Sequence, residues 1–415
     1  MKKFNRPIYV TAGYNTVSLG TGRKEFHPKK PRPGIEHYIE EAGRGALAQV
    51  NDASNIDEGV IANFMAPRFN RQGNIPALMP RIDPKLEYKP LVSVEGACGS
   101  GGLGLTTATK TVLSGMADTV LTVGFEVQNT VKAIYGADIL GGAGHYASQR
   151  KDGHAYFFPG KFSDRACAAY EKFGYDRVRE AMARWYERAI LNARLCPKAQ
   201  EHHNSIEDLF ATGMTKPNGK AFCDCINVYD CSKVSDGASA VVFASEEGLK
   251  KLGVDKKDTV ELVGYGQVVA DVSKDPEDQT KLTTSARAAK AAMEMAGITT
   301  KDIGMLEVHD CFTIGGLLSL EAIGIVGYGE SYDFVCEGGT APDGAMPTNL
   351  SGGLVGYGHY TGGTGVRQAA DIAMQFTGRP DGQKLKEDPN KPFGLMVSMG
   401  GNDRTVVSCV FKKVQ

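Results

Sequence analysis

The order of predicted elements in the first part of the chain recurs in the second part. The first copy comprises a helix at 35–50, a strand at 57–64, a helix at 100–113 and a strand at 118–125. The second copy comprises a helix at 285–296, a strand at 301–309, a helix at 364–377 and a strand at 393–399. In both copies a glycine-rich turn opens the second helix. A repeat on this scale predicts two similar α/β halves packed together, with functional groups at the strand ends where the halves meet.

The stretch between the two copies interrupts this pattern. Residues 134–161 are rich in glycine and aromatic residues, and 164–197 carry apolar residues at helical spacing. We therefore predict a lobe inserted into the first half. The predicted division is an N-terminal half at 1–125 and 230–256, an inserted loop domain at 126–229, and a C-terminal half at 257–415. Tyr156, Phe157 and Phe158 are candidates for binding the substrate, or alternatively for fixing the lobe to the core.

The stretch of the first half most typical of a catalytic site is VEGACGSGG at 94–102, which contains Cys98. It follows an apolar run at 90–94 and precedes a helical segment, so Cys98 is predicted at a strand-to-helix turn. The N–H groups of a helix N-terminus favour negative charge, and such a site can lower the pKa of a thiol from about 8.5. We interpret Cys98 as a candidate nucleophile. The alternative is a small buried apolar side chain, as most free cysteines are.

Three stretches of the second half also carry reactive groups after predicted strands. EVHDCF at 307–312 contains His309 and Cys311, and SGGLVGYGHYTGGTG at 351–365 contains His359. SMGG at 398–401 ends a strand in bare backbone N–H groups. A single histidine is more often structural, but two histidines and a second cysteine at such junctions favour a catalytic site.

These four stretches, in this order, resemble the motif blocks of the thiolase superfamily, and SKVSDGASAVV resembles the segment that closes the first half of those enzymes. The resemblance covers essentially the whole chain. It implies a duplicated thiolase fold of class α/β, with five layers α-β-α-β-α and an inserted loop domain. It also implies that Cys98 becomes acylated, that His359 activates it, and that the N–H groups of Cys98 and Gly400 form an oxyanion hole. His309 stands where many members carry an asparagine that holds a water of another oxyanion hole.

Two positions depart from the family pattern. Ser398 stands where better-known thiolases carry their acid/base cysteine, and HDCF resembles the sterol-carrier-protein-2 type, in which the cysteine of that motif takes this role. The resemblance therefore assigns the acid/base role to Cys311. Tyr360 replaces the usual proline after the histidine and changes either the pocket or only the loop.

The implied activity is thiolytic cleavage of a β-ketoacyl-CoA, or the reverse Claisen condensation, with coenzyme A as co-substrate and no permanently bound cofactor. The alternatives are a ketoacyl synthase, a hydroxymethylglutaryl-CoA synthase, or a non-catalytic subunit of an acyl-CoA-handling complex. Acetoacetyl-CoA is the default substrate, and an aromatic or branched ketoacyl-CoA is consistent with the aromatic residues at 156–158. The resemblance suggests a homodimer or dimer of dimers and allows a small companion subunit with a zinc ribbon and an OB fold.

Composition, charge and cysteine content bear on the other functional classes, on location and on metal binding. The formal net charge is −1, so no basic field points to nucleic acid or an anionic membrane. We see no signal peptide and no membrane-spanning apolar run, which favours a cytoplasmic protein. The nine cysteines are odd in number and scattered, which favours reduced thiols. Cys223, Cys225 and Cys231 are a weak zinc signal because no second ligand pair follows, so no metal site is predicted.

Overall fold

The computed structural model describes residues 3–149 and 155–414. Its strands are β1 Ile8–Thr11, β2 Tyr14–Asn15, β3 Glu58–Ala62, β4 Leu91–Val94, β5 Thr119–Val127, β6 Asp236–Ala244, β7 Thr259–Val269, β8 Ile303–Glu307, β9 Phe393–Gly400 and β10 Thr405–Lys413. Its helices are α1 Ile35–Leu47, α2 Ala66–Phe69, α3 Ser100–Ser114, α4 Ala133–Leu140, α5 Tyr146–Gln149, α6 Phe157–Phe173, α7 Tyr175–Arg194, α8 Leu209–Gly213, α9 Glu246–Leu252, α10 Thr283–Ala296, α11 Thr313–Ile323, α12 Ser331–Cys336, α13 Gly353–Tyr357 and α14 Thr364–Phe376.

The strand order shows the duplication directly. The described strands form one hydrogen-bonded array in the order β4-β3-β5-β6-β1-β7-β10-β9-β8, and β2 pairs with β6. Moving outward from β1, the pairings are antiparallel, antiparallel, parallel and parallel. Moving outward from β7, they follow the same sequence, and a parallel bridge from Leu306 to Thr348 takes the place of the last strand. The predicted repeat is therefore confirmed, with β3 and β5 corresponding to β8 and β9.

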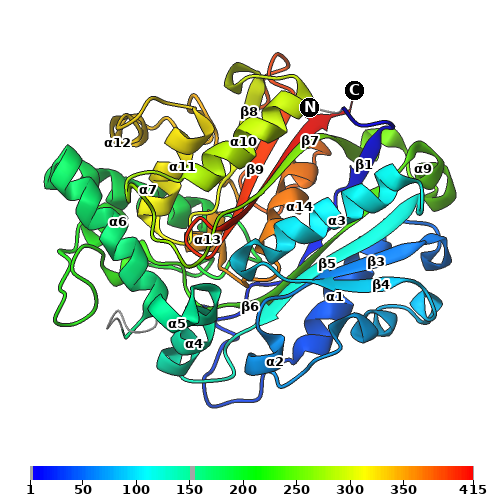
Figure 1. Ribbon diagram of the computed structural model, residues 1–415, viewed down its shortest axis with the longest axis horizontal. Coiled ribbons are helices and arrows are strands. Elements are labelled where there is room, and N and C mark those ends of the chain that lie inside the picture. Colours follow the sequence, from blue (N-terminus) through cyan, green and yellow to red (C-terminus); the bar gives the residue numbers. More distant parts are fainter. Residues whose placement is uncertain (1–2, 150–154, 415) are drawn as a thin grey trace.

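Three hydrophobic cores separate the layers. On β6, Val241 and Phe243 join a central core shared with α3 and α14, whereas Ala240 and Val242 face the opposite way, into a core shared with α1. The third core covers the outer face of the second half and includes residues of α10 and α11. This two-residue alternation places helices on both faces of each half. The predicted α-β-α-β-α layering is confirmed, and Figure 1 shows α3 and α14 in the middle of the molecule.

The inserted segment is mostly helical and packs on the second half. Figure 1 shows α4, α5, α6 and α7 together at one side of the molecule. Phe162 of α6 and Trp185 of α7 belong to the same core as Leu317 of α11. The predicted single helical block at 164–197 is two helices, because Gly174 has a φ of 90° and ends α6. The domain limits given above stay a prediction, and the predicted loop 134–161 includes 150–154, which lie outside the described residues.

A disulfide links two distant parts of the lobe. It joins Cys167 of α6 to Cys225, which lies 58 residues further along the chain. The expectation that the thiols are reduced is wrong for this pair, because contacts between residues so far apart cannot be derived from cysteine spacing. The remaining cysteines are free: Cys98, Cys196, Cys223, Cys231, Cys311, Cys336 and Cys409.

Candidate active site

Cys98 lies on a strained turn between β4 and α3. It is the middle residue of a short 3₁₀ turn, Ala97–Gly99, and its side chain is buried. Ala97 has a φ of 55°, in the left-handed region that residues with a Cβ seldom occupy. The conformation is fixed locally: the Ser100 hydroxyl donates to the Ala97 carbonyl at 2.6 Å, and the Ala97 N–H donates to Glu95 Oε1 at 2.6 Å. Backbone strain held in this way is typical of functional turns.

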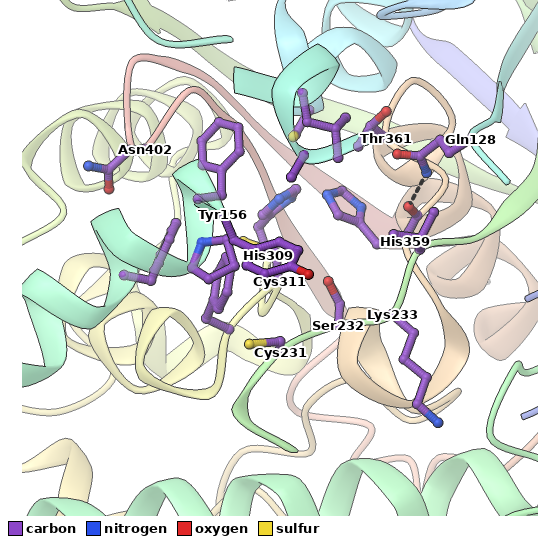
Figure 2. Close-up of a pocket in the computed structure, with 18 of the residues that line it drawn as sticks. Gln128, Tyr156, Cys231, Ser232, Lys233, His309, Cys311, His359, Thr361 and Asn402 are labelled. Atoms are coloured by element: carbon purple, nitrogen blue, oxygen red, sulfur yellow. Dashed lines mark hydrogen bonds between the residues drawn. The ribbon is translucent and has the colours of Figure 1, made fainter. Parts of the chain in front are cut away.

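His359 is held in one orientation on the loop before α14. Its backbone N–H donates to Ser235 Oγ at 2.8 Å, and Gln128 Nε2 donates to its carbonyl at 2.8 Å, the bond dashed in Figure 2. Its Nδ1 lies 2.8 Å from Thr364 Oγ1, which itself lies 3.2 Å from the Tyr360 carbonyl. Because a carbonyl can only accept, the Thr364 hydroxyl donates there and accepts from Nδ1–H. The Nε2 atom of His359 is then left with a lone pair and can accept a proton.

His309 lies beside His359 within the second half, and together they face Cys98 of the first half. It follows β8, and the two imidazole rings are 5.0 Å apart in an edge-to-face arrangement. The Cys98 sulfur and one ring nitrogen from each histidine all lie within 4.8 Å of one another. Cys311 lines the same cavity (Figure 2). The structure thus brings together the four side chains that the motifs predicted as catalytic.

Gly400 lies directly against the Cys98 turn at the end of β9. A Cβ added at Gly400 would come 2.4 Å from the Gly96 carbonyl oxygen and 3.2 Å from the Cys98 backbone nitrogen. Only glycine therefore fits. The backbone of Gly400 and the backbone N–H of Cys98 are neighbours, as two donors of one oxyanion hole must be.

The two departures from the family pattern lie away from the cavity. Ser398 is fully buried, and a Cβ at Gly365 would come 2.8 Å from its hydroxyl oxygen, so it packs between α3 and α14. Tyr360 is also fully buried, and its hydroxyl hydrogen-bonds to Ser239 at 2.8 Å. Neither residue is among those that line the cavity. Tyr360 thus belongs to the packing of the loop rather than to the pocket wall.

The three aromatic candidates divide into two groups. Tyr156 and Phe158 line the cavity, whereas Phe157 is buried and is not part of its wall. Instead, a Cβ at Gly144 would come 2.4 Å from the Phe157 ring. Sequence reasoning missed other lining residues: Gln128, Phe162, Cys231, Thr361 and Asn402. Gln128 and Asn402 follow the ends of β5 and β9, a position that could have identified them.

Burial controls the protonation of the site. It raises the pKa of the Cys98 thiol to about 12, with a smaller contribution from Glu126, and lowers the pKa of His359 to about 3, with a contribution from Arg367. The pKa of His309 is also lowered well below its usual range by burial, and then by His359 and Arg367. At neutral pH both imidazoles are uncharged and the thiol keeps its proton. The expectation of a helix-stabilised thiolate is therefore wrong, because burial outweighs the helix N-terminus.

Glu126 is a buried carboxyl group that sequence reasoning missed. It accepts hydrogen bonds from the backbone N–H groups of Phe64 and Met65 at 3.0 Å each, and from the Thr361 hydroxyl at 2.9 Å. Burial raises its pKa. It connects the end of β5 to the segment after β3 and to the loop that carries His359. Glu126 therefore fixes the position of this loop relative to the first half of the chain.

Cys98, His309 and His359 are also the residues, within the described ranges, that could share a metal ion. A thiolate with two imidazoles suits zinc. The three cysteines at 223–231 do not form such a group, since Cys225 is bound to Cys167. Among the described helices, none is both long enough and apolar enough to cross a membrane.

Comparisons with known proteins agree with this geometry. The family model for the thiolase C-terminal domain matches residues 266–413. The chain is 30% identical to acetyl-CoA acetyltransferase of Methanothermobacter thermautotrophicus over 379 residues, covering 90% of this chain and 94% of that protein. It is 27% identical to human sterol carrier protein 2 over 411 residues, covering 94% and 70%.

Solved structures give the same fold at lower identity. The Ltp2-ChsH2(DUF35) aldolase superposes with a TM-score of 0.76 at 20% identity, covering 99% of this chain and 98% of that one. Human mitochondrial 3-ketoacyl-CoA thiolase superposes with a TM-score of 0.71 at 16% identity, covering 99% and 100%. The duplicated fold, the motif order and these similarities lead to one conclusion: the chain belongs to the thiolase superfamily and is an acyltransferase of that kind.

Proposed function

We propose that this enzyme cleaves a β-ketoacyl-CoA with free coenzyme A, or runs the reverse Claisen condensation, through an acyl group carried on Cys98. One observation supports this most directly. The Cys98 sulfur lies within 4.8 Å of ring nitrogens of His309 and His359, in a cavity that Cys311 also lines. A nucleophile, a base and an acid then reach one small substrate, as covalent acyl transfer requires.

The first half-reaction breaks a carbon–carbon bond. Nε2 of His359 takes the proton of the Cys98 thiol as the sulfur adds to the β-keto carbon. The bond between the α and β carbons then breaks, and its electron pair passes to the α carbon and the thioester oxygen as an enolate. Cys311 gives its proton to the α carbon, which releases the shorter acyl-CoA. His309 and His359 donate toward the enolate oxygen in this scheme, and one such donor lowers the barrier by about 3–4 kcal/mol.

The second half-reaction transfers the acyl group. The Cys311 thiolate takes the proton of the coenzyme A thiol as its sulfur adds to the carbonyl of acyl-Cys98, and the negative oxygen accepts from the N–H groups of Cys98 and Gly400. The carbon–sulfur bond to Cys98 then breaks, protonated His359 returns its proton to the Cys98 sulfur, and the second acyl-CoA leaves the free enzyme. Each step is reversible, so the same groups serve condensation, and ping-pong kinetics are expected.

The assignment of Cys311 as the acid/base distinguishes this proposal from its alternatives. A ketoacyl synthase works with two histidines and needs no second thiol, yet here Cys311 lines the cavity while Ser398 does not. A non-catalytic subunit would not need a base whose Nδ1 is fixed by Thr364. We therefore favour thiolase chemistry over a ketoacyl synthase, a hydroxymethylglutaryl-CoA synthase or a binding subunit.

We further propose that the enzyme is cytoplasmic and forms a homodimer or dimer of dimers. The edge strand β4 supports self-association, since Val92 is 44% exposed there. A small companion subunit stays part of the proposal, because a solved assembly of the same fold includes a DUF35 component in its name.

The test uses labelled acyl-CoA and two cysteine variants. Cys98 should take up the acyl label, and Cys98→Ala should abolish both labelling and thiolysis. Cys311→Ala should still be labelled but should lose carbon–carbon bond exchange. Cys336→Ala, a half-buried thiol on α12, is the matched control and should behave as wild type. Label on another cysteine, or near-normal turnover by Cys311→Ala, would overturn the assigned roles.

A further inference from the structure

We propose that the acyl group that this enzyme places on Cys98 is apolar and about as large as a phenyl ring. The preferred substrate is then an aryl-substituted or similarly bulky β-ketoacyl-CoA rather than acetoacetyl-CoA. The inference rests on the proposed thiolysis and specifies its substrate class.

The cavity has two chemically different ends. Gln128, Ser232 and Lys233 contribute polar atoms to one wall, and the Lys233 side chain is 44% exposed and pairs with Glu201. In Figure 2, Lys233 and Asn402 lie on opposite sides of His309 and Cys311. The polar groups on the Lys233 side suit the polar arm of coenzyme A. The acyl group must then contact the remaining walls of the cavity.

One of these walls is a face of α4 that carries two alanines and a leucine. Ala133, Ala137 and Leu140 are four and three residues apart, so they lie on the same side of the helix, and all three line the cavity. Ile134 and Tyr135 on the other side of α4 are 41% and 62% exposed. The alanines leave open space beside the catalytic groups, whereas larger side chains there would fill it.

Another wall is aromatic and rigid. Phe158 and Phe162 of α6 line the cavity together with Phe312. Phe162 stacks on Phe312 with ring centroids 4.3 Å apart and an angle of 18° between the planes. Fixed rings prefer offset or edge contacts with another ring, so this wall favours a flat apolar group.

The size of the cavity agrees with such a group. Its volume is about 160 Å³ in all, which the reacting carbons of the substrate and the acyl group share. An apolar cavity of about 150 Å³ in a protein core holds benzene, whereas one methyl group fills only a small part of such a space. Replacing the methyl group of acetoacetyl-CoA by phenyl should therefore raise kcat/KM roughly 10- to 100-fold.

The first experiment compares substrates that release the same acetyl-CoA. Acetoacetyl-CoA, 3-oxohexanoyl-CoA and 3-oxo-3-phenylpropanoyl-CoA are assayed for coenzyme A-dependent loss of the ketoacyl thioester by the purified full-length enzyme. We expect kcat/KM to rise along this series. A series that falls from acetoacetyl-CoA to the phenyl substrate would overturn the inference while leaving the proposed thiolysis intact.

The second experiment fills the space. Ala137→Leu should lower the ratio of kcat/KM for the phenyl substrate to that for acetoacetyl-CoA at least tenfold. Tyr135→Leu, on the exposed side of the same helix, is the matched control and should leave this ratio unchanged. A ratio that stays constant in Ala137→Leu would show that α4 does not border the acyl group, and would overturn the inference.

A binding measurement separates the two proposals. Calorimetric titration compares 3-phenylpropanoyl-CoA with butanoyl-CoA, neither of which can be cleaved. Tighter binding of the phenyl compound without thiolysis of any ketoacyl-CoA would show that the cavity accepts a phenyl group but would refute the proposed function. Equal binding, together with turnover of acetoacetyl-CoA, would do the reverse.

Discussion

Removing the hydroxyl group of Thr364 should disable the proposed base, His359, without changing the His359 side chain itself. Thr364 is fully buried, and its hydroxyl accepts from Nδ1–H of His359 at 2.8 Å. In Thr364→Val that N–H loses its acceptor, which costs about 1–3 kcal/mol for a buried group. The cost favours the other tautomer, which carries its proton on Nε2 and cannot take one from Cys98. Thr364→Val should therefore lower kcat/KM by about 5- to 150-fold.

Two assays check this reasoning. Thiolysis reports the whole reaction, and alkylation of Cys98 by iodoacetamide reports only the loss of its proton, so both should fall by a similar factor. Thr364→Ser should restore both rates, since it returns the hydroxyl. Thr377→Val at the other end of α14 removes a hydroxyl that donates to the Ala373 carbonyl at 2.7 Å, and is the matched control. Rates within twofold of wild type in Thr364→Val would refute the role of Thr364 in fixing the tautomer.

Three further predictions follow from the same site. Alkylation of Cys98 should change less than about twofold from pH 7 to 9, because burial keeps the thiol protonated, with its pKa raised to about 12, and His359 neutral, with its pKa lowered to about 3, so the proton passes within the pair; a tenfold rise per pH unit would show that the thiolate forms without His359. Zinc ions should inhibit thiolysis by binding Cys98, His309 and His359, with reversal by a chelator and protection by acyl-CoA; inhibition that acyl-CoA leaves unchanged would place the metal elsewhere. Gly400→Ala should abolish thiolysis and lower stability by about 1–3 kcal/mol in thermal unfolding, since its Cβ would lie 2.4 Å from the Gly96 carbonyl; normal activity would show that the turn can move.

The repeated half could be predicted because its strands and helices carry strong apolar patterns. The strand at 118–125 is realised as β5, every residue of which is buried, and the helix at 35–50 as α1. β7 was missed because Gly264 and Gly266 weaken its strand pattern. These glycines have a tertiary reason: a Cβ at Gly266 would come 2.0 Å from the Ala288 carbonyl oxygen of α10. Close packing of a helix on a strand cannot be read from the strand alone.

The candidate site shows the same division between local and long-range information. Local motifs predicted Cys98, His309, Cys311 and His359, because each follows a strand in a distinctive stretch. The walls of the cavity come from separate segments, such as Gln128 after β5 and Asn402 after β9, and only the fold brings them together. The direction of the Cys98 pKa shift was predicted wrongly for a related reason, since the sequence shows the helix N-terminus but not how completely the fold excludes water.

Burial of the whole site has a consequence for the timing of the reaction. Because the pKa of Cys98 is raised and that of His359 is lowered, the thiolate–imidazolium pair is unfavourable in the free enzyme. Proton transfer becomes favourable only when the sulfur can add to a carbonyl and the new negative charge moves to an oxygen held by the N–H groups of Cys98 and Gly400. The enzyme then does not keep a reactive thiolate in the absence of substrate, which limits its oxidation and alkylation. Fixed donors compensate the charge that burial makes costly, so the same water exclusion that suppresses ionisation in the free enzyme strengthens those donors during the reaction.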